Sequence, residues 1–233
     1  MKNWAISLAE AKKSNFSSQN HDFVSVSNFM TAPQTAIDAA SLQNFAKITP
    51  QYPGIRAPLP QNVSLAWLNE LSPLLDNVFG EAKTGWEIQA WFSLVTAKPE
   101  ELIPMQRFPH VDGTNPRQLA MMLYLHDTPH GGTGFFRHRS TGLESLTDES
   151  FPKYRAALQQ DVQRSGLPPA AYVTDGAPHF ERTYASDGAF NQAVFYRGNV
   201  LHSGLIDASQ ELSPDPARGR LTINAFFRPI GGE

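Results

Sequence analysis

Apolar and polar positions alternate in a series of short segments that begins near residue 86. In the first segment, Ala90 and Phe92 lie on one face of an extended backbone and Trp91 lies on the other, which is the two-residue period of a β-strand. The segments are rich in aromatic and β-branched residues, and Gly, Pro, Asn and Asp separate them, so each is a predicted strand. These predicted strands are Trp86–Thr96, Ile103–Phe108, Gln118–Leu125, Thr133–His138, Gln192–Tyr196, Val200–His202 and Arg220–Phe227.

The first 80 residues mix extended and helical patterns. Phe23–Phe29 alternates as a strand does, and Ala36–Ala46 has helical spacing. A second helix is predicted with Ser64 as its N-cap, a kink or restart at Pro73 and an end at Gly80. This helix is expected to pack on the sheet that follows it in the chain.

Two further segments depart from these patterns. Tyr52–Pro60 contains three Pro and one Gly, which predicts an extended loop without regular structure. Arg56 lies within this loop, and both a structural role and a contact with substrate are open for it. Phe151–Ser165 has helical composition, with apolar residues spaced four apart, and predicts a helix inserted among the strands.

Many short strands with few helices predict a mainly β (α+β) fold, a β-sandwich or jelly roll with helices packed on one face. No internal repeat or low-complexity tract divides the chain, so residues 1–233 are expected to form a single domain. Within it, residues 1–80 would be an N-terminal α/β extension. Residues 85–233 would be the jelly-roll core, with the helical insert near residues 150–166.

The charge balance excludes one class of partner. Nineteen Lys and Arg against 22 Asp and Glu give a net charge of -3 without a basic block, which argues against binding nucleic acid by phosphate neutralisation. Met1–Asn15 lacks the uncharged apolar stretch of a signal peptide, and apolar runs such as Leu119–Leu125 are too short to span a membrane. We therefore expect a cytoplasmic protein without a membrane or nucleic-acid partner.

The chain has seven His and no Cys, so any metal must be held by imidazole nitrogen and carboxylate oxygen. His110 and Asp112 stand at positions i and i+2, whose side chains share one face of an extended backbone. His202, 92 residues further on, completes a set of two His and one carboxylate, which is typical of ferrous iron sites. His179 and Glu181 form a rival pair, but they precede His202 by only 23 residues, which leaves room for little more than a hairpin.

A candidate anion-binding cation opens the last predicted strand. Arg220 and Thr222 point to the same face there, so a guanidinium and a hydroxyl can bind one carboxylate together. Arg218 is a competing anchor, but it precedes Gly219 in the loop, and we prefer Arg220 because it begins the hydrophobic strand.

In this order, His110, Asp112, His202 and Arg220 resemble the motif of the iron(II)- and 2-oxoglutarate-dependent dioxygenases. The stretch from Leu123 to Phe135, with glycines at 131, 132 and 134, also looks like the second-strand pattern of prolyl-hydroxylase-like members. The resemblance covers roughly residues 86–229, and residues 1–80 look like a poorly characterised bacterial branch of that superfamily.

The resemblance implies a double-stranded β-helix, which is a jelly roll, and it implies roles for single residues. His110, Asp112 and His202 would bind Fe(II), and Arg220, helped by Thr222, would hold the distal carboxylate of 2-oxoglutarate as cosubstrate. Tyr124 would contact the cosubstrate through its hydroxyl. The sequence departs from the family at His126, which stands where Asn is usual, and in the 18 residues between His202 and Arg220, which exceed the usual spacing.

The expected function is therefore that of an oxidoreductase, a dioxygenase that hydroxylates an unidentified polar small molecule, amino acid or peptide. Two alternatives stay open, because the same roll hosts different functions. One is a cupin-like metal-dependent enzyme that does not use 2-oxoglutarate, in which Arg220 would be structural. The other is a non-catalytic jelly-roll binding module. A homodimer is also an open expectation.

Overall fold

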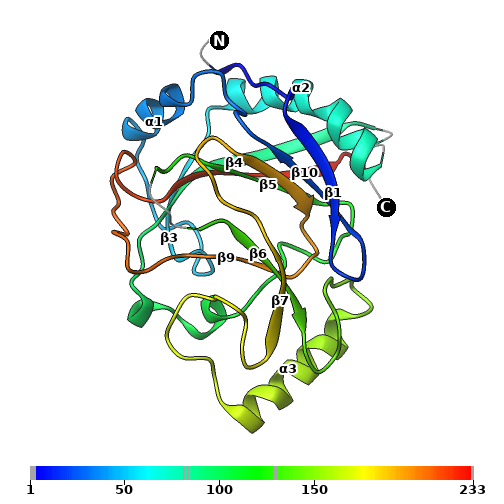
Figure 1. Cartoon of the computed structure of the whole chain (residues 1–233). Coiled ribbons are helices and arrows are strands. Elements are labelled where there is room, and N and C mark those ends of the chain that lie inside the picture. The colour runs from blue at the N-terminus through cyan, green and yellow to red at the C-terminus, as the bar shows by residue number, and fades with distance from the viewer. Residues whose placement is uncertain (1–3, 81, 83, 128–130, 232–233) are drawn as a thin grey trace.

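The computed structural model describes residues 4–80, 82, 84–127 and 131–231, and its strands form two antiparallel sheets (Figure 1). One sheet has seven strands in the order β1-β2-β8-β5-β10-β4-β3, and the other has three in the order β7-β6-β9. The strands are β1 (Ala11–Phe16), β2 (His21–Val26), β3 (Gly54–Pro58), β4 (Trp86–Val95), β5 (Leu119–Tyr124), β6 (Thr133–His138), β7 (Phe180–Ala185), β8 (Ala193–Arg197), β9 (His202–Gly204) and β10 (Leu221–Pro229). The mainly β, jelly-roll-like fold expected from the sequence is confirmed.

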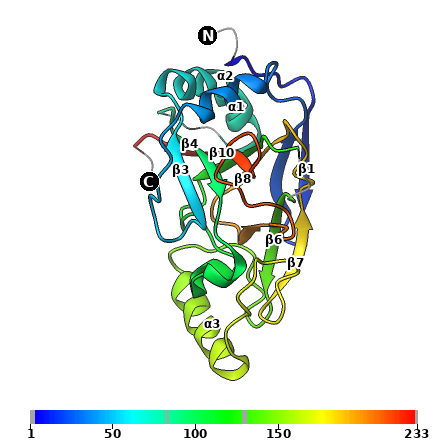
Figure 2. The ribbon, with the colours of Figure 1, turned by 90° about the vertical axis from the view of Figure 1, so that its left-hand side faces the viewer.

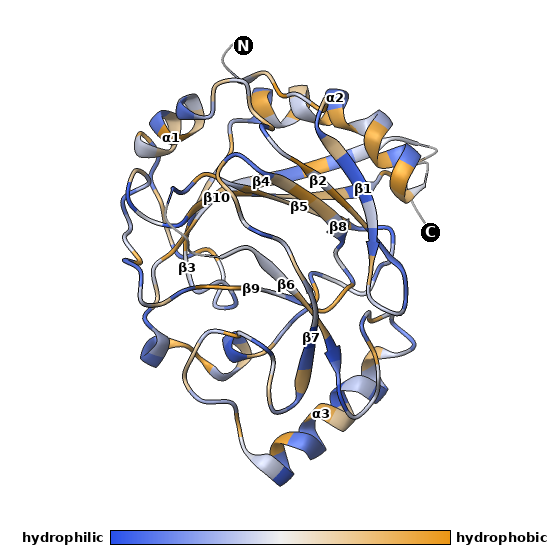
Figure 3. Cartoon of the chain, viewed as in Figure 1, coloured by the Kyte–Doolittle hydropathy of each residue, from blue (hydrophilic) through white to orange (hydrophobic). Residues whose placement is uncertain are grey.

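The helices lie at opposite ends of the molecule (Figure 2). They are α1 (Gln34–Ser41), α2 (Gln61–Phe79) and α3 (Phe151–Ser165). The first two cover the outer face of the seven-stranded sheet, and α3 lies beyond the three-stranded sheet. Few of the side chains of α3 are buried, and hydrophilic and hydrophobic residues alternate along the helix in Figure 3. None of the helices in the described residues has the length and apolar character needed to cross a bilayer.

The alternation along β5 shows how one strand serves two cores. Leu119, Met121 and Leu123 belong to the main core, between the seven-stranded sheet and the first two helices. Ala120 and Tyr124 point the other way, into an aromatic cluster between the two sheets. Full burial of one such apolar side chain stabilises the fold by about 1.5–3 kcal/mol. The second face of β5 thereby becomes a wall of the interior where the candidate site lies.

The first 80 residues share the sheet of the jelly-roll core. Strand β2 pairs with β8, and β3 pairs with β4, while β1 and β3 form the two edges of the seven-stranded sheet. Strands β1 and β7 lie on the same side of the molecule (Figure 2). Phe16 at the end of β1 stacks on Tyr184 of β7, with 5.2 Å between the ring centroids. Residues of the N-terminal segment therefore take part in both cores. The single-domain organisation and its internal boundaries stay a prediction.

Four local expectations were wrong, and the first three concern a predicted strand and the second helix. The segment predicted as a strand over Ile103–Phe108 instead holds the 3₁₀ turn Pro104–Arg107, preceded by another at Pro99–Glu101, because Pro fixes φ at the first position of each turn. The second helix begins after Pro60 rather than at Ser64, which is a buried residue within the helix. It also continues through Pro73 without a restart.

The loop expected over Tyr52–Pro60 contains β3, and this is the correction that matters most for the site. An edge strand pairs on one side only, so it tolerates the prolines that exclude a central strand. Close approach explains Gly54, where a Cβ atom would lie 1.9 Å from the carbonyl oxygen of Leu94. The structure also adds β1 and β7, which were not expected.

Candidate metal centre and its cavity

Backbone pairing brings the three candidate ligands together. His202 begins β9, and its amide and carbonyl exchange hydrogen bonds of 2.8 and 2.9 Å with the carbonyl and amide of His110. The amide of Asp112 donates to the carbonyl of Gly198 at 2.8 Å, just before β9. Residues that lie far apart in the sequence are thereby held as neighbours by the main chain.

The side chains converge on one point. His110 Nε2 lies 4.0 Å from Asp112 Oδ1, and His202 Nε2 lies 3.5 Å from Asp112 Oδ2. One ligand atom from each residue lies within 4.8 Å of the other two. Donor atoms that bind one ion at about 2.0–2.2 Å must lie within roughly twice that distance of one another, and these atoms come close to that limit.

The protonation states suit metal binding at neutral pH. Nδ1 of His202 lies 2.9 Å from the carbonyl oxygen of Val200, which can only accept, so Nδ1 carries the proton and Nε2 offers its lone pair. Burial lowers the pKa of His202 to about 4. The imidazole of His110 is 55% exposed into the cavity, and its pKa is also lowered, by the surrounding protein and then by His202. Both rings are therefore neutral.

Asp112 combines burial with an incomplete set of contacts. Burial raises its pKa to about 6, while His110, Arg56 and Arg228 act in the opposite direction. Its Oδ2 has no hydrogen-bond partner within the described part of the chain. A buried carboxylate oxygen without a donor is costly, and a cation bound beside it removes that cost. Two neutral imidazoles and this carboxylate therefore fit a divalent metal ion.

Arg220 lies in the same cavity without an acidic partner. Its side chain is almost fully buried, and one terminal nitrogen donates to the carbonyl oxygens of Gly131 and Gly132 at 3.2 and 3.3 Å. Its Nε has no partner among the described residues, and burial lowers its pKa. Arg218 is different, because it is 63% exposed and pairs with Glu211 at 2.7 Å. The preference for Arg220 as the anion-binding residue thus agrees with its position.

Tyr124 and Thr222 stand behind the cavity wall. They lie opposite each other on β5 and β10. The hydroxyl of Tyr124 is hydrogen-bonded to Thr133 and Ser186 at 2.8 and 2.9 Å, and that of Thr222 donates to Asn224 at 2.8 Å. Thr133 and Asn224 line the cavity, whereas Tyr124 and Thr222 do not. The ring of Tyr124 lies 5.9 Å from the guanidinium of Arg220, so it holds that cation in place.

The cavity has a volume of about 400 Å³, within the range of small-molecule sites. His110, Asp112, His202 and Arg220 line it together, and Arg56 from β3 is a second arginine in its wall. The sequence offered one weak signal for Arg56, a single cation among apolar residues and prolines, and left its role open. The rival pair lies elsewhere, since His179 contacts the carbonyl of Gly166 and Glu181 pairs with Arg137.

The chain belongs to a family described as a family of unknown function, DUF6445, whose profile matches residues 8–227. No curated protein matches the chain significantly. Among solved structures, the chain is similar to HygX from Streptomyces hygroscopicus with nickel and 2-oxoglutarate bound, at 12% identity and a TM-score of 0.54, over 90% of this chain and 83% of that one.

Two other solved structures are similar at lower scores. EctD from S. alaskensis with bound Fe has 14% identity and a TM-score of 0.46, over 94% of this chain and 84% of that one. A Pseudomonas putida prolyl-4-hydroxylase has 13% identity and a TM-score of 0.42, over 91% and 94%. At such identities, the likeness to HygX establishes a common fold, and the fold that the sequence resemblance implied is confirmed.

Proposed function

We propose that this protein is an Fe(II)- and 2-oxoglutarate-dependent dioxygenase that hydroxylates a small molecule or peptide. One observation carries the proposal: a His–Asp–His ligand set and a buried Arg without an acidic partner line the same cavity. The likeness in fold to HygX, which was solved with nickel and 2-oxoglutarate bound, supports the same pair of cofactors.

In this proposal His110, Asp112 and His202 hold the iron. When bound, ferrous iron would let dioxygen act as the oxidant, with one oxygen atom going into succinate as 2-oxoglutarate loses carbon dioxide and the other into the hydroxylated substrate. The protein keeps the three donors in place through the backbone pairing of His110 with His202. The rings of Phe135 and Tyr196 pack beside His202, at centroid distances of 6.5 and 4.9 Å, and exclude water from that side of the site.

Arg220 binds the distal carboxylate of 2-oxoglutarate in this proposal. A guanidinium forms two parallel hydrogen bonds with a carboxylate, and here one of its nitrogens is already oriented by the carbonyls of Gly131 and Gly132. Tyr124 and Thr222 take positioning roles. The first supports the guanidinium with its ring, and the second orients Asn224 in the cavity wall.

The test is an anaerobic titration with Fe(II) and 2-oxoglutarate, followed by the weak visible absorption band that chelation of ferrous iron by 2-oxoglutarate produces. We expect the band in the native protein and its loss in His202→Ala. Arg220→Gln should weaken 2-oxoglutarate binding by roughly 10- to 100-fold, because a charged hydrogen-bond pair is lost, with little change in iron affinity. Arg218→Gln is the matched control and should behave as the native protein does.

The alternatives give different results in the same titration. A cupin-like enzyme would bind the metal but show no band with 2-oxoglutarate, and a non-catalytic module would bind neither. Either result contradicts the proposal. Succinate formed in air with Fe(II) and 2-oxoglutarate alone, and abolished in Asp112→Ala, would add support from chemistry.

We propose a small organic molecule or a peptide as substrate and the cytoplasm as location. The volume of the cavity supports a small ligand, and the absence of a basic block in the sequence supports a protein that does not bind nucleic acid. The homodimer stays a prediction, and gel filtration with light scattering tests it directly.

A further inference from the structure

The cavity has a second cation, Arg56, which the proposed mechanism does not use. Its guanidinium carbon lies 4.0 Å from the centroid of the Tyr52 ring and 5.8 Å from that of Trp91. Stacking on the two rings fixes the plane of the guanidinium and leaves its edge to form hydrogen bonds. Its Nε is buried and has no partner among the described residues. The cation is thus well oriented and incompletely paired.

The charged side chains that line the cavity carry an excess of positive charge. Asp112 is the one acidic side chain among the described residues that line it, against Arg56 and Arg220. Two arginines and a divalent metal ion contribute four positive charges, and Asp112 and the 2-oxoglutarate dianion contribute three negative ones. One positive charge remains, and an unpaired charge in a partly buried site is unfavourable. Since Arg220 is assigned to 2-oxoglutarate, the remaining charge is that of Arg56.

The wall beside Tyr52, the ring on which Arg56 stacks, is apolar. Val95, Tyr172 and Ile206 belong to a small hydrophobic cluster that Tyr52 packs against, and all four residues line the cavity. The side chain of Met105, also in the lining, is 51% exposed and extends the apolar surface outward. A ligand that contacts Arg56 and extends along Tyr52 therefore meets several apolar side chains.

We propose that Arg56 binds a carboxylate of the primary substrate, which is a small organic monoacid with an apolar body. The inference rests on the proposed function, because it assigns Arg220 to the cosubstrate and leaves Arg56 for the substrate. One carboxylate neutralises the single remaining positive charge, whereas a phosphate dianion would add one negative charge too many. The apolar body lies against Val95, Tyr172 and Ile206.

The test compares acids with their neutral amides. Butanoate, hexanoate and octanoate, and butanamide, hexanamide and octanamide, are titrated into the protein loaded with Zn(II) and 2-oxoglutarate, and into the metal-free protein, with tryptophan fluorescence and calorimetry as readouts. Trp91, close to Arg56, makes the fluorescence sensitive to this site. We expect at least one acid to bind about tenfold or more tightly than its amide, the difference that a charged hydrogen bond supplies.

Arg56→Gln should abolish this preference, and Arg56→Lys should keep part of it because the charge remains. Arg218→Gln, which removes a surface arginine paired with Glu211, should leave it unchanged. Thermal unfolding of each variant establishes that it is folded. Equal affinity for acids and amides across the series, or an unchanged preference in folded Arg56→Gln, would overturn the inference and show that Arg56 serves only to pack on Tyr52.

Failure of the inference and failure of the proposed function are distinguishable. If 2-oxoglutarate affinity falls in Arg56→Gln but not in Arg220→Gln, Arg56 anchors the cosubstrate, and the inference is wrong while the proposed function stands. If the native protein binds no 2-oxoglutarate with Zn(II), the proposed function fails. The preference for acids in the metal-free protein then reports separately whether Arg56 binds a carboxylate.

Discussion

His110 and His202 are paired through their main chains, by hydrogen bonds of 2.9 Å and 2.8 Å between the amide of each residue and the carbonyl of the other. Their imidazole rings lie on the same side of this pairing, with 4.5 Å between the centroids. The distance between the two rings is therefore set by the backbone, which pre-organises the site. A pre-organised site loses little free energy to reorganisation on binding.

Removal of one imidazole should abolish tight metal binding without unfolding the protein. We expect His202→Ala to weaken Zn(II) or Mn(II) binding by more than the roughly 10- to 100-fold that loss of an outer contact costs, measured by competition with a chromophoric chelator. His179→Ala is the matched control, since His179 is also buried but lies outside the site. Equal affinities in the two variants would contradict the ligand assignment.

Substitution by Ala should have different effects at two glycines that have similar backbone conformations. Gly131 and Gly142 both have positive φ, 79° and 72°, so Ala strains both. A Cβ at Gly131 would also lie 2.1 Å from the carbonyl oxygen of Leu205, whereas Gly142 has open space. Because the Gly131 carbonyl orients Arg220, Gly131→Ala should weaken 2-oxoglutarate binding more than Gly142→Ala does, by calorimetry with Zn(II). Similar losses would argue that Arg220 does not need this support.

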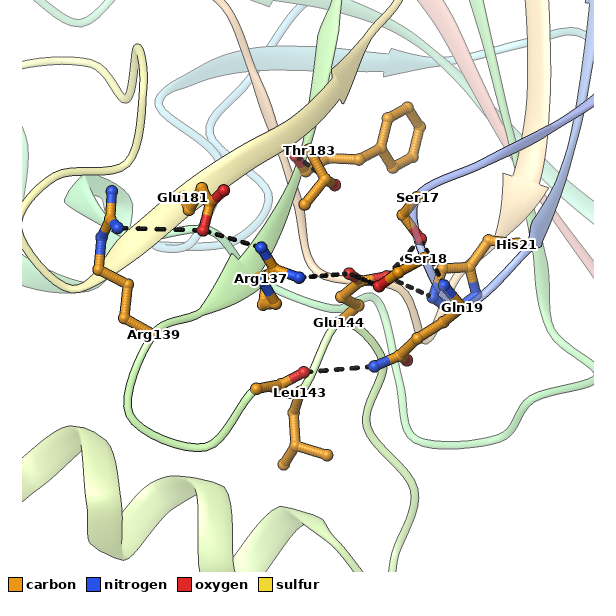
Figure 4. Close-up of polar contacts among 12 residues, drawn as sticks. Ser17, Ser18, Gln19, His21, Arg137, Arg139, Leu143, Glu144, Glu181 and Thr183 are labelled. Atoms are coloured by element: carbon orange, nitrogen blue, oxygen red, sulfur yellow. Dashed lines mark hydrogen bonds and ion pairs between the residues drawn. The ribbon is translucent and has the colours of Figure 1, made fainter.

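A buried carboxylate fastens the turn between β1 and β2 to the loop after β6 (Figure 4). Glu144 is 1% exposed, accepts hydrogen bonds from Ser17 and Ser18, and lies 3.4 Å from His21 Nε2. Glu144→Ala should lower the free energy of unfolding by about 2–3 kcal/mol in urea, because these donors lose a charged acceptor. Glu70→Ala on the exposed side of α2 should change it by less than about 0.5 kcal/mol. A similar small effect for Glu144 would mean that water replaces it without cost.

His138 should make stability depend on pH. Its ring is fully buried among Tyr154, Phe180 and Asp161, and burial lowers its pKa, although Asp161 acts in the opposite direction and the nearby His179 in the same one. The unfolded chain takes up a proton near pH 6.5, which the folded protein takes up only at lower pH, so stability falls as pH drops below 6.5.

The check is urea unfolding of His138→Gln beside the native protein between pH 7.5 and 5. The variant cannot titrate at this position, so its stability should fall less steeply over that interval. Parallel slopes in the two proteins would show that His138 does not contribute to the pH dependence. The metal-free form is used throughout, so that metal binding does not add its own proton release.

The three candidate ligands could be found in the sequence because their signal is local. His110 and Asp112 share a face through the two-residue period of an extended backbone, and His202 ends the predicted strand Val200–His202 and begins β9 in the structure. The pairing of His110 with His202 is not local, and only the closed sheet reveals it. Arg220 was identifiable for the same reason as His202, since it immediately precedes a long hydrophobic strand.

Arg56 and its strand were beyond a reading of the sequence. The prolines around it have the composition of a loop, and only the pairing of β3 with β4 makes that segment a strand. Its ring contacts come from Tyr52 nearby and Trp91 on the neighbouring strand, so their geometry depends on register. The wrong strand prediction for Ile103–Phe108 has a related cause. Apolar residues of that segment lie in or beside a 3₁₀ turn and do not form a paired strand.

The two edges of the seven-stranded sheet are built so that they cannot easily recruit another chain. On β1, Lys12 and Lys13 are exposed, and their charges repel an approaching copy. On β3, the outward amide and carbonyl of Arg56 are already bonded to Ala46, and Pro53 and Pro58 on either side have no amide hydrogen to offer. The large sheet is thus protected from edge-to-edge aggregation. A homodimer of this chain has to form through a surface other than these edges.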